Sequence, residues 1–250
     1  MPALRAESGA GSHSGCVRER NEDSFVAREQ EGLWAVADGM GGEANGDWAS
    51  ATLVEALGSI PLPLAFEEAC EAIPEAISRA NLQIYERSLE RGRTIGSTVV
   101  VLFAQDQRFV VFWAGDSRAY LLRNGALHRI SRDHSQVQEM VDCGMLRPEE
   151  APGHPMGHVL ARAVGVETDL DLDAVQGDIR PGDVFLLCSD GLHGYVPEAD
   201  IARLLVRAEP LESVEQLIAT TLELGAPDNV TVIAIGFGEP TVLSIGGGPR

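Results

Sequence analysis

Two Asp-Gly dipeptides, beginning at Asp38 and Asp190, stand where apolar, strand-like runs of the sequence end. A third acid, Asp228, directly precedes a run of the same kind, and a fourth, Asp116, follows another. Acids at strand ends can meet at one edge of a sheet sandwich, where carboxylates can share cations. Ligands that are all oxygen favour hard ions such as Mg²⁺ or Mn²⁺. Asp-Gly is also ordinary turn chemistry, so spacing alone leaves a metal site and a set of turns both open.

The elements that must position these acids are read from hydrophobic periodicity. Apolar runs rich in β-branched and aromatic residues predict strands over residues 24–27, 33–37, 97–104, 108–113, 117–122, 126–130, 184–188 and 229–237. Asn124 and Gly125 predict a two-residue hairpin turn between two of these strands. Helical spacing predicts helices over residues 46–58, 64–91, 135–143, 160–164, 197–208 and 211–224.

The order of these elements indicates the fold class. In the longest predicted helix, Pro74 marks a kink or a break, and the apolar face is expected to hold Ile73, Ile77, Leu82, Ile84 and Leu89. Strands and hairpins have helix pairs set between them, which argues for an α+β fold of antiparallel sheets covered by helices. No repeat or long linker divides the chain. We therefore expect residues 1–237 to form one domain and the Gly/Pro-rich residues 238–250 a disordered tail.

Composition argues against several classes of protein. Of 250 residues, 38 are acidic and 19 basic, and the resulting net charge of −19 repels a phosphate backbone, so nucleic-acid binding is not expected. No apolar stretch is long enough to span a bilayer, and the N-terminus lacks the apolar segment of a signal peptide. The four cysteines form no CxxC pair, which is typical of a reduced inventory. We expect a cytoplasmic protein with no membrane partner.

Eight short motifs occur along the chain, namely RERNEDS (18–24), ADGMGG (37–42), GSTV (96–99), GDSRAY (115–120), DHS (133–135), LARAVG (160–165), CSDGL (188–192) and DNVT (228–231). In sequence and order they resemble the motifs of the PPM family, the protein phosphatase 2C-like metal-dependent phosphatases, in their compact bacterial form. Any one string is weak, whereas eight in register are specific. The resemblance implies a four-layer αββα sandwich, in which two packed antiparallel sheets carry helices on both outer faces.

The same resemblance implies metal-binding roles. Asp38 would bridge two metal ions, and the Gly39 carbonyl would bind one of them. Asp190 and Asp228 would complete the other site. Asp116, together with Asp190, would hold a third and weaker ion. The implied cofactors are therefore two or three Mn²⁺ or Mg²⁺ ions.

Three further residues take roles by this resemblance. Asp23 and Glu22 would hold metal-bound waters outside the direct ligands. Arg18 would bind the substrate phosphate, because a guanidinium fork suits two phosphoryl oxygens. An ordinary surface salt bridge is the alternative for Arg18.

The implied activity is that of a serine/threonine protein phosphatase, which hydrolyses phosphoserine and phosphothreonine on proteins by attack of a metal-bridging water or hydroxide. The cations and Arg18 would offset charge on the equatorial phosphoryl oxygens, which reconciles an anionic substrate with an acidic chain. The implied partners are phosphorylated proteins and the bacterial Ser/Thr kinase that the enzyme would oppose. A hydrolase of small phosphate esters and a non-catalytic phosphoprotein-binding protein are the alternatives.

Some positions depart from the family pattern or exclude other chemistries. Many relatives have His after DGMGG, where this chain has Glu43, and others have His where it has Met40. The general acid is therefore unassigned, and a metal-bound water is one candidate. A cysteine-based phosphatase needs Cys, five residues and Arg, which neither Cys143 nor Cys188 provides, and there is no GxSxG or HExxH motif.

Histidines and methionines stand out in the loosely patterned region from 134 to 166. His134 in the DHS string is expected to be a structural partner for a loop. His154 and His158 are expected to be solvated surface side chains, with contact to the phosphopeptide as the alternative. Met140 and Met145 are expected to pack rather than to recognise substrate.

Overall fold

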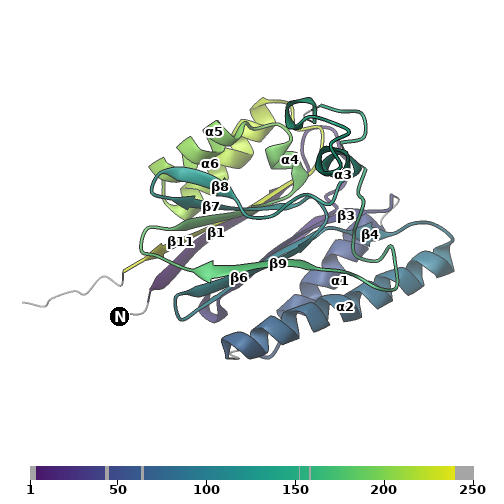
Figure 1. Ribbon diagram of the computed structural model, residues 1–250, viewed down its shortest axis with the longest axis horizontal. Helices are drawn as coiled ribbons and strands as arrows, with labels where there is room; N and C mark the ends of the chain where they lie inside the picture. Colours follow the sequence, from purple (N-terminus) through teal and green to yellow (C-terminus); the bar gives the residue numbers. More distant parts are fainter. Residues whose placement is uncertain (1–3, 43–44, 63–64, 152, 158, 240–250) are drawn as a thin grey trace, which may run out of the picture.

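The computed structural model describes residues 4–42, 45–62, 65–151, 153–157 and 159–239, and these residues build two antiparallel β-sheets packed face to face (Figure 1). The first sheet has the order β1–β11–β10–β7–β8, formed by β1 (Arg5–His13), β11 (Val230–Gly238), β10 (Val184–Cys188), β7 (Arg118–Arg123) and β8 (Ala126–Arg129). The second has the order β2–β3–β5–β6–β9, formed by β2 (Asp23–Arg28), β3 (Leu33–Met40), β5 (Val99–Gln105), β6 (Arg108–Ala114) and β9 (Asp173–Asp178), and β4 (Gly96–Ser97) pairs with β3.

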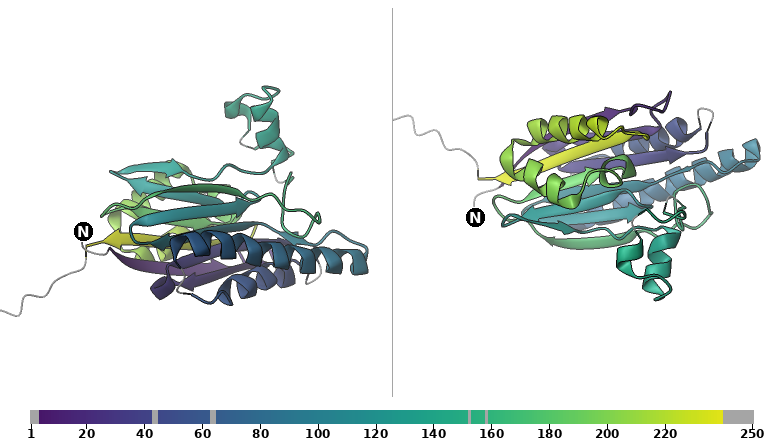
Figure 2. Two further views of the ribbon diagram at one scale, coloured as in Figure 1. Left: turned by 60° about the horizontal axis from the view of Figure 1, so that its bottom comes forward. Right: turned by 90° about the horizontal axis from the view of Figure 1, so that it is seen from above.

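Helices cover the outer face of each sheet (Figure 1). The second sheet carries α1 (Gly46–Gly58) and α2 (Phe66–Arg91), and the first carries α4 (Asp190–His193), α5 (Glu198–Arg207) and α6 (Pro210–Glu223). Figure 2 shows that α3 (Gln136–Asp142) and the 3₁₀ turn η2 (Pro148–Glu150) belong to a segment projecting from the sandwich. Another 3₁₀ turn, η1 (Glu29–Glu31), joins β2 to β3. The predicted four-layer fold is confirmed.

Strand β3 shows why the central runs of the sequence are apolar without interruption. Leu33, Ala35 and Ala37 pack in the cluster that includes α1 and α2, whereas Trp34 and Val36 pack in the cluster between the sheets. Successive side chains of a strand point to opposite faces. A strand covered on both faces therefore buries consecutive residues, and these five side chains are fully buried.

Most predicted elements are present, with ends shifted by up to three residues, and the helix over 46–58 has the predicted ends. The hairpin is also confirmed, because Asn124 and Gly125 have φ of 53° and 79°, as a type I′ turn requires. α2 continues through Pro74 without a break. β11 extends to Gly238, one residue past the expected domain boundary. Residues 240–250 lie outside the described residues, so the tail and the domain limits stay predictions.

Two predictions about helices are wrong. Leu82 and Leu89 are 48% and 65% exposed, because at 3.6 residues per turn they lie roughly 180° and 160° around α2 from the buried Ile73. Residues 160–164 form no helix. Their backbone groups instead bond to other segments, since Val164 and Ser97 exchange two hydrogen bonds of 2.9 and 3.0 Å.

Strands β1 and β9 were not predicted. Their sequences, RAESGAGSH and DAVQGD, are small and polar and lack apolar alternation. Both become strands because they pair with strongly apolar neighbours, β1 with β11 and β9 with β6. None of the helices in the described ranges combines the length and apolar character needed to cross a membrane.

Candidate metal centre and active site

Sheet register places two of the predicted acids opposite each other. Asp23 in β2 and Asp38 in β3 are direct partners of the antiparallel ladder, and Asp116 follows β6 of the same sheet. In the other sheet, Asp190 comes directly after β10 and Asp228 comes shortly before β11, the neighbouring strand. The five carboxylates therefore come from strand ends of both sheets.

Electrostatics shows that these carboxylates act on one another. Loss of hydration raises the pKa of Asp38 well above its ordinary value, and the charges of Asp23, Asp190, Asp116 and Asp228 raise it further. Burial, followed by neighbouring carboxylates, raises the pKa of Asp23 to about 7 and that of Asp116 to about 8. Like charges gathered in this way favour uptake of protons or of cations.

The donor atoms of this cluster fit hard divalent cations. They are carboxylate oxygens together with the backbone carbonyl of Gly39, a set that suits Mg²⁺ or Mn²⁺. Asp23 Oδ2 accepts a hydrogen bond of 2.8 Å from Ser189 Oγ, whereas the buried Oδ1 atom has no hydrogen-bond partner. Across the described residues, no three His, Cys, Asp or Glu side chains converge closely enough to enclose an ion. One of the acids, Asp228, is instead bonded to Arg18.

Two glycines allow the backbone around the acids to close up. A Cβ on Gly39 would collide with the carbonyl oxygen of Gly46, and a Cβ on Gly191 would collide with that of Asn229. Gly39 N also donates a hydrogen bond of 3.1 Å to Glu22 O. The close approach at Gly39 holds its carbonyl beside Asp38. The close approach at Gly191 lets α4 pack against the residue before β11.

The cluster lies in an open cavity of about 950 Å³, which Arg18, Glu22, Asp38, Asp190 and Asp228 all line. Arg18 Nη2 donates a hydrogen bond of 2.7 Å to Asp228 Oδ2, and this bond raises the pKa of the guanidinium. The Arg18 side chain remains 53% exposed. Partial burial and then Asp47 raise the pKa of Glu22. The structure thus brings the predicted site residues to the lining of one cavity, except Asp23, which is buried beside its ladder partner Asp38.

The hydroxyl groups of Ser189 and Thr98 form hydrogen bonds that link the acids to neighbouring strands. Ser189 Oγ, which donates to Asp23, accepts a hydrogen bond of 3.0 Å from Thr231 N and so joins the sheets beside the cluster. Asp38 N donates to Thr98 Oγ1 at 3.0 Å, and Thr98 N donates to Asp38 O at 2.8 Å. These residues fall inside the family-like strings, yet sequence reasoning gave them no role.

Asn229 is a further residue that sequence reasoning missed. Its Nδ2 donates hydrogen bonds of 2.9 Å to the carbonyls of Ser14 and Arg20, and its Oδ1 accepts one of 2.8 Å from Glu22 N. One amide therefore holds both ends of the loop that carries Arg18. The sequence signal was the DNVT string, in which Asn229 follows Asp228.

His193 also escaped sequence reasoning. It ends α4, three residues after Asp190, and its Nε2 lies 2.9 Å from Asp116 O. A carbonyl only accepts, so Nε2 carries the proton of this bond. Burial lowers the pKa of His193 to about 4, which keeps the ring neutral at pH 7. The imidazole thereby joins α4 to the loop after β6.

The remaining predictions have mixed outcomes. His134 is a structural partner for a loop, as predicted, because its Nδ1 accepts a hydrogen bond of 3.2 Å from Gly115 N and its ring stacks on Trp113. Met145 is 73% exposed, so its predicted packing is wrong. The family-pattern position Glu43 and the predicted surface residue His158 lie outside the described residues.

For three other positions named in the sequence analysis, Met40, His154 and Met140, the structure gives the surroundings of the side chain, and the predictions made for them stay predictions. Met40 lines the site cavity and supplies no proton donor for catalysis. His154 Nδ1 accepts a hydrogen bond of 3.2 Å from Met156 N, and the side chain is half-buried. Met140 is half-buried on α3.

Known proteins resemble this chain along most of its length. The serine/threonine phosphatase Stp of Listeria innocua is 33% identical over 231 residues, which are 88% of this chain and 92% of that protein. The serine/threonine protein phosphatase PstP of Mycobacterium tuberculosis is 38% identical over 230 residues, which are 90% of this chain but 43% of that longer protein.

Solved structures share the fold at similar identity. PppA of Pseudomonas aeruginosa has a TM-score of 0.88 and 37% identity, with 95% of this chain and 100% of that chain covered. The catalytic domain of PstP, solved in complex with two manganese ions, has a TM-score of 0.85 and 34% identity, with 94% and 99% covered. A family model described as protein phosphatase 2C matches residues 9–140. The resemblance inferred from the motifs is thus confirmed, and the chain belongs to the protein phosphatase 2C family.

Proposed function

We propose that this chain is a metal-dependent serine/threonine protein phosphatase, which hydrolyses phosphoserine and phosphothreonine in other proteins. One observation carries the proposal. The Asp38 carboxyl lies in the field of four other carboxylates, in a cavity that Arg18 also lines. A cavity that can gather cations and also offers a guanidinium suits a phosphate dianion, although the chain as a whole is acidic.

The residues proposed to hold the ions follow the family pattern. Asp38 and the Gly39 carbonyl would serve one Mn²⁺ or Mg²⁺, and Asp38, Asp190 and Asp228 the other. Asp116 with Asp190 would take a third, more weakly held ion. When bound, such ions lower the pKa of a shared water and draw charge from a phosphoryl group. Asp23 and Glu22 would orient waters around them.

The chain's own side chains have defined tasks in this proposal. Arg18 would bind two phosphoryl oxygens through its guanidinium fork and hold phosphorus in line for attack. Asp38 and Asp190 would keep their carboxylates ionised once cations are present. The leaving seryl or threonyl oxygen needs a proton, and no protein side chain is assigned to supply it.

The biological setting is a further part of the proposal. The relatives named serine/threonine phosphatases support phosphorylated proteins as substrates, and we propose that a Ser/Thr kinase supplies them. A cytoplasmic location is supported by the four cysteines, which are free thiols in the structure, because reducing compartments keep thiols unpaired.

Turnover of a phosphothreonine peptide by metal-free protein, with and without added Mn²⁺ or Mg²⁺, tests the proposal. Metal should restore activity, and Asp190→Asn should lose several hundredfold or more of kcat. Asp200→Asn is the matched control, since Asp200 lies on the surface and pairs with Arg203. A folded wild type that stays inactive with metal would make the chain a phosphoprotein-binding relative. Turnover of small phosphate esters alone would favour a general phosphohydrolase.

A further inference from the structure

A second cavity, of about 1030 Å³, opens beside the catalytic one. Three residues line both cavities, namely Asp116, Asp190 and Tyr195. A polypeptide whose phosphate lies at Arg18 and Asp38 can therefore continue into the second space without leaving the surface. We name this second space the side cavity.

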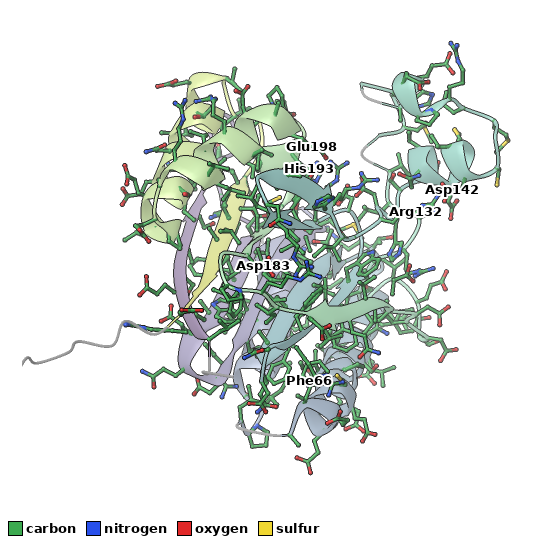
Figure 3. All side chains as sticks on the ribbon, turned by 60° about the vertical axis from the view of Figure 1, so that its left-hand side comes forward. Phe66, Arg132, Asp142, Asp183, His193 and Glu198 are labelled. Atoms are coloured by element: carbon green, nitrogen blue, oxygen red, sulfur yellow. The ribbon has the colours of Figure 1, made fainter. Side chains whose placement is uncertain are left out.

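The side cavity lies between the projecting segment and the body of the sandwich. Figure 3 shows His193 and Glu198 on the body and Arg132 and Asp142 towards the projecting segment, where Arg132 is paired with Asp142. Val137 and Val141 of α3 also line it. The wall thus combines apolar and charged side chains, as a site for an extended peptide requires.

Arg129 is the arginine of the side cavity best placed to bind a ligand. The guanidinium of the neighbouring Arg118 already donates hydrogen bonds within the protein, to both oxygens of Asp133 at 2.9 and 2.6 Å and to Tyr120 Oη at 3.0 Å. Arg129 Nη1 lies 3.7 Å from Asp133 Oδ2, the oxygen that Arg118 already holds at 2.6 Å. Arg118 Nη1 also lies 3.8 Å from Glu198 Oε1. Arg118 is therefore paired with two carboxylates, whereas the ion pair of Arg129 is the longer contact to the already occupied Asp133.

This arrangement leaves Arg129 with unused donor capacity. A guanidinium has five N–H donors, and the Arg129 side chain is 32% exposed. In a chain of net charge −19, a cation that lines a cavity and is so weakly neutralised is suited to an incoming carboxylate. Phosphate would compete poorly for this place, because Arg18 and any cations bound in the catalytic cavity would attract it more strongly.

We propose that the side cavity binds the substrate polypeptide beside its phosphorylated residue, and that Arg129 selects an acidic side chain there. This inference rests on the proposed phosphatase function and adds a substrate class to it, namely phosphoproteins with an acidic residue on one side of the phosphosite. Arg129 acts as a specificity residue and touches no reacting atom.

The test uses phosphothreonine peptides in which a single Glu or Gln is moved through the three positions on either side of the phosphorylated residue. The wild type should prefer Glu over Gln by about threefold to tenfold in kcat/KM at one or two positions on one side, as for a partly exposed ion pair. Arg129→Gln should remove this preference. Arg129→Glu should reverse it in favour of peptides with Arg at the same positions.

Two controls separate recognition from chemistry. Arg203→Gln changes an exposed guanidinium on α5 that pairs with Asp200, and it should keep the preference. Turnover of p-nitrophenyl phosphate, which has no flanking chain, should stay within about twofold in all variants. Equal wild-type rates on Glu and Gln peptides, or a preference that survives in Arg129→Glu, would overturn the inference while leaving the phosphatase function intact. Loss of wild-type turnover on every peptide and on the ester would refute the proposed function itself.

Discussion

The guanidinium of Arg18 is hydrogen-bonded to Asp228, with 2.7 Å between Nη2 and Oδ2. The residue proposed to bind phosphate is thus paired with a residue proposed to bind metal. Both side chains are partly exposed, at 53% and 34%, so the pair can open at small cost. A cation bound at Asp228 would compete with Arg18 for that carboxylate and leave the guanidinium available to substrate.

Arg18→Gln should therefore bind Mn²⁺ more tightly than the wild type, by about twofold to fivefold, because a competing positive charge is removed. The same variant should lose about a hundredfold or more of kcat/KM on a phosphopeptide, since a bidentate phosphate contact is gone. Calorimetric titration of metal-free protein with Mn²⁺ checks the first expectation without any turnover. Unchanged or weaker metal binding would show that the pair does not compete with the ion, and Arg203→Gln serves as the control.

Asp38→Asn should stabilise the metal-free protein while abolishing its activity. The wild-type carboxyl is held among four others, and its neutral isostere removes that repulsion, worth on the order of 1–3 kcal/mol. Chemical denaturation in the presence of a chelator measures the change.

Asp183→Asn is the matched control for Asp38→Asn. Asp183 is also buried, but its carboxylate accepts hydrogen bonds of 2.8 and 2.6 Å from Arg123. Its replacement should destabilise by about 3 kcal/mol, because a buried charge pair is broken. If both variants lose stability, the carboxylates around Asp38 are not in net repulsion.

The stability of the metal-free protein should fall as the pH rises from about 6 to 8. Asp23 and Asp116 have folded-state pKa values of about 7 and 8, above the ordinary value of 3.8. The folded state therefore holds protons that the unfolded chain has released, so the stabilisation is present at low pH and is lost as the pH passes these values. His193, with a pKa lowered to about 4, acts in the opposite sense below its ordinary value of 6.5.

Thermal denaturation at pH 6, 7 and 8 measures this effect, which amounts to at most ~1.4 kcal/mol per pH unit for each proton released. Saturating Mn²⁺ should flatten the dependence, because a bound cation favours the ionised carboxylates at every pH in the range. A metal-free melting temperature that rises over this interval would contradict the raised pKa values.

Asn229→Ala should impair catalysis by loosening the loop that carries Arg18. Three hydrogen bonds of the Asn229 amide hold this loop, and their net contribution is about 1 kcal/mol each. We expect a loss of roughly 2–3 kcal/mol in the free energy of unfolding and a rise in KM for phosphopeptides. Asn124→Ala, in the exposed hairpin turn between β7 and β8, should leave KM unchanged. A variant with wild-type KM would limit Asn229 to a role in stability.

The sequence motifs by themselves predicted the acids of the candidate site and the strands that precede them. Strings such as ADGMGG and CSDGL contain the acids, and apolar runs predicted the strands, because both signals lie within a few consecutive residues. The order of those elements was enough for an α+β fold of antiparallel sheets covered by helices, and the family resemblance supplied the four-layer sandwich. Where local signal was weak, as in β1 and β9, the prediction failed, since those segments become strands only through their partners.

Tertiary structure alone decided which side chains meet. The register that sets Asp23 opposite Asp38, the bond between Arg18 and Asp228 across 210 positions of sequence, and the two arginines that share Asp133 all depend on packing of distant segments. Residues 160–164 have the sequence pattern of a helix, yet their backbone forms β-bridges with Ser97 of β4 and with Ser135, the residue before α3. Periodicity reports which face of an element is apolar, but the partner of a charged group is fixed only when the two sheets close on each other.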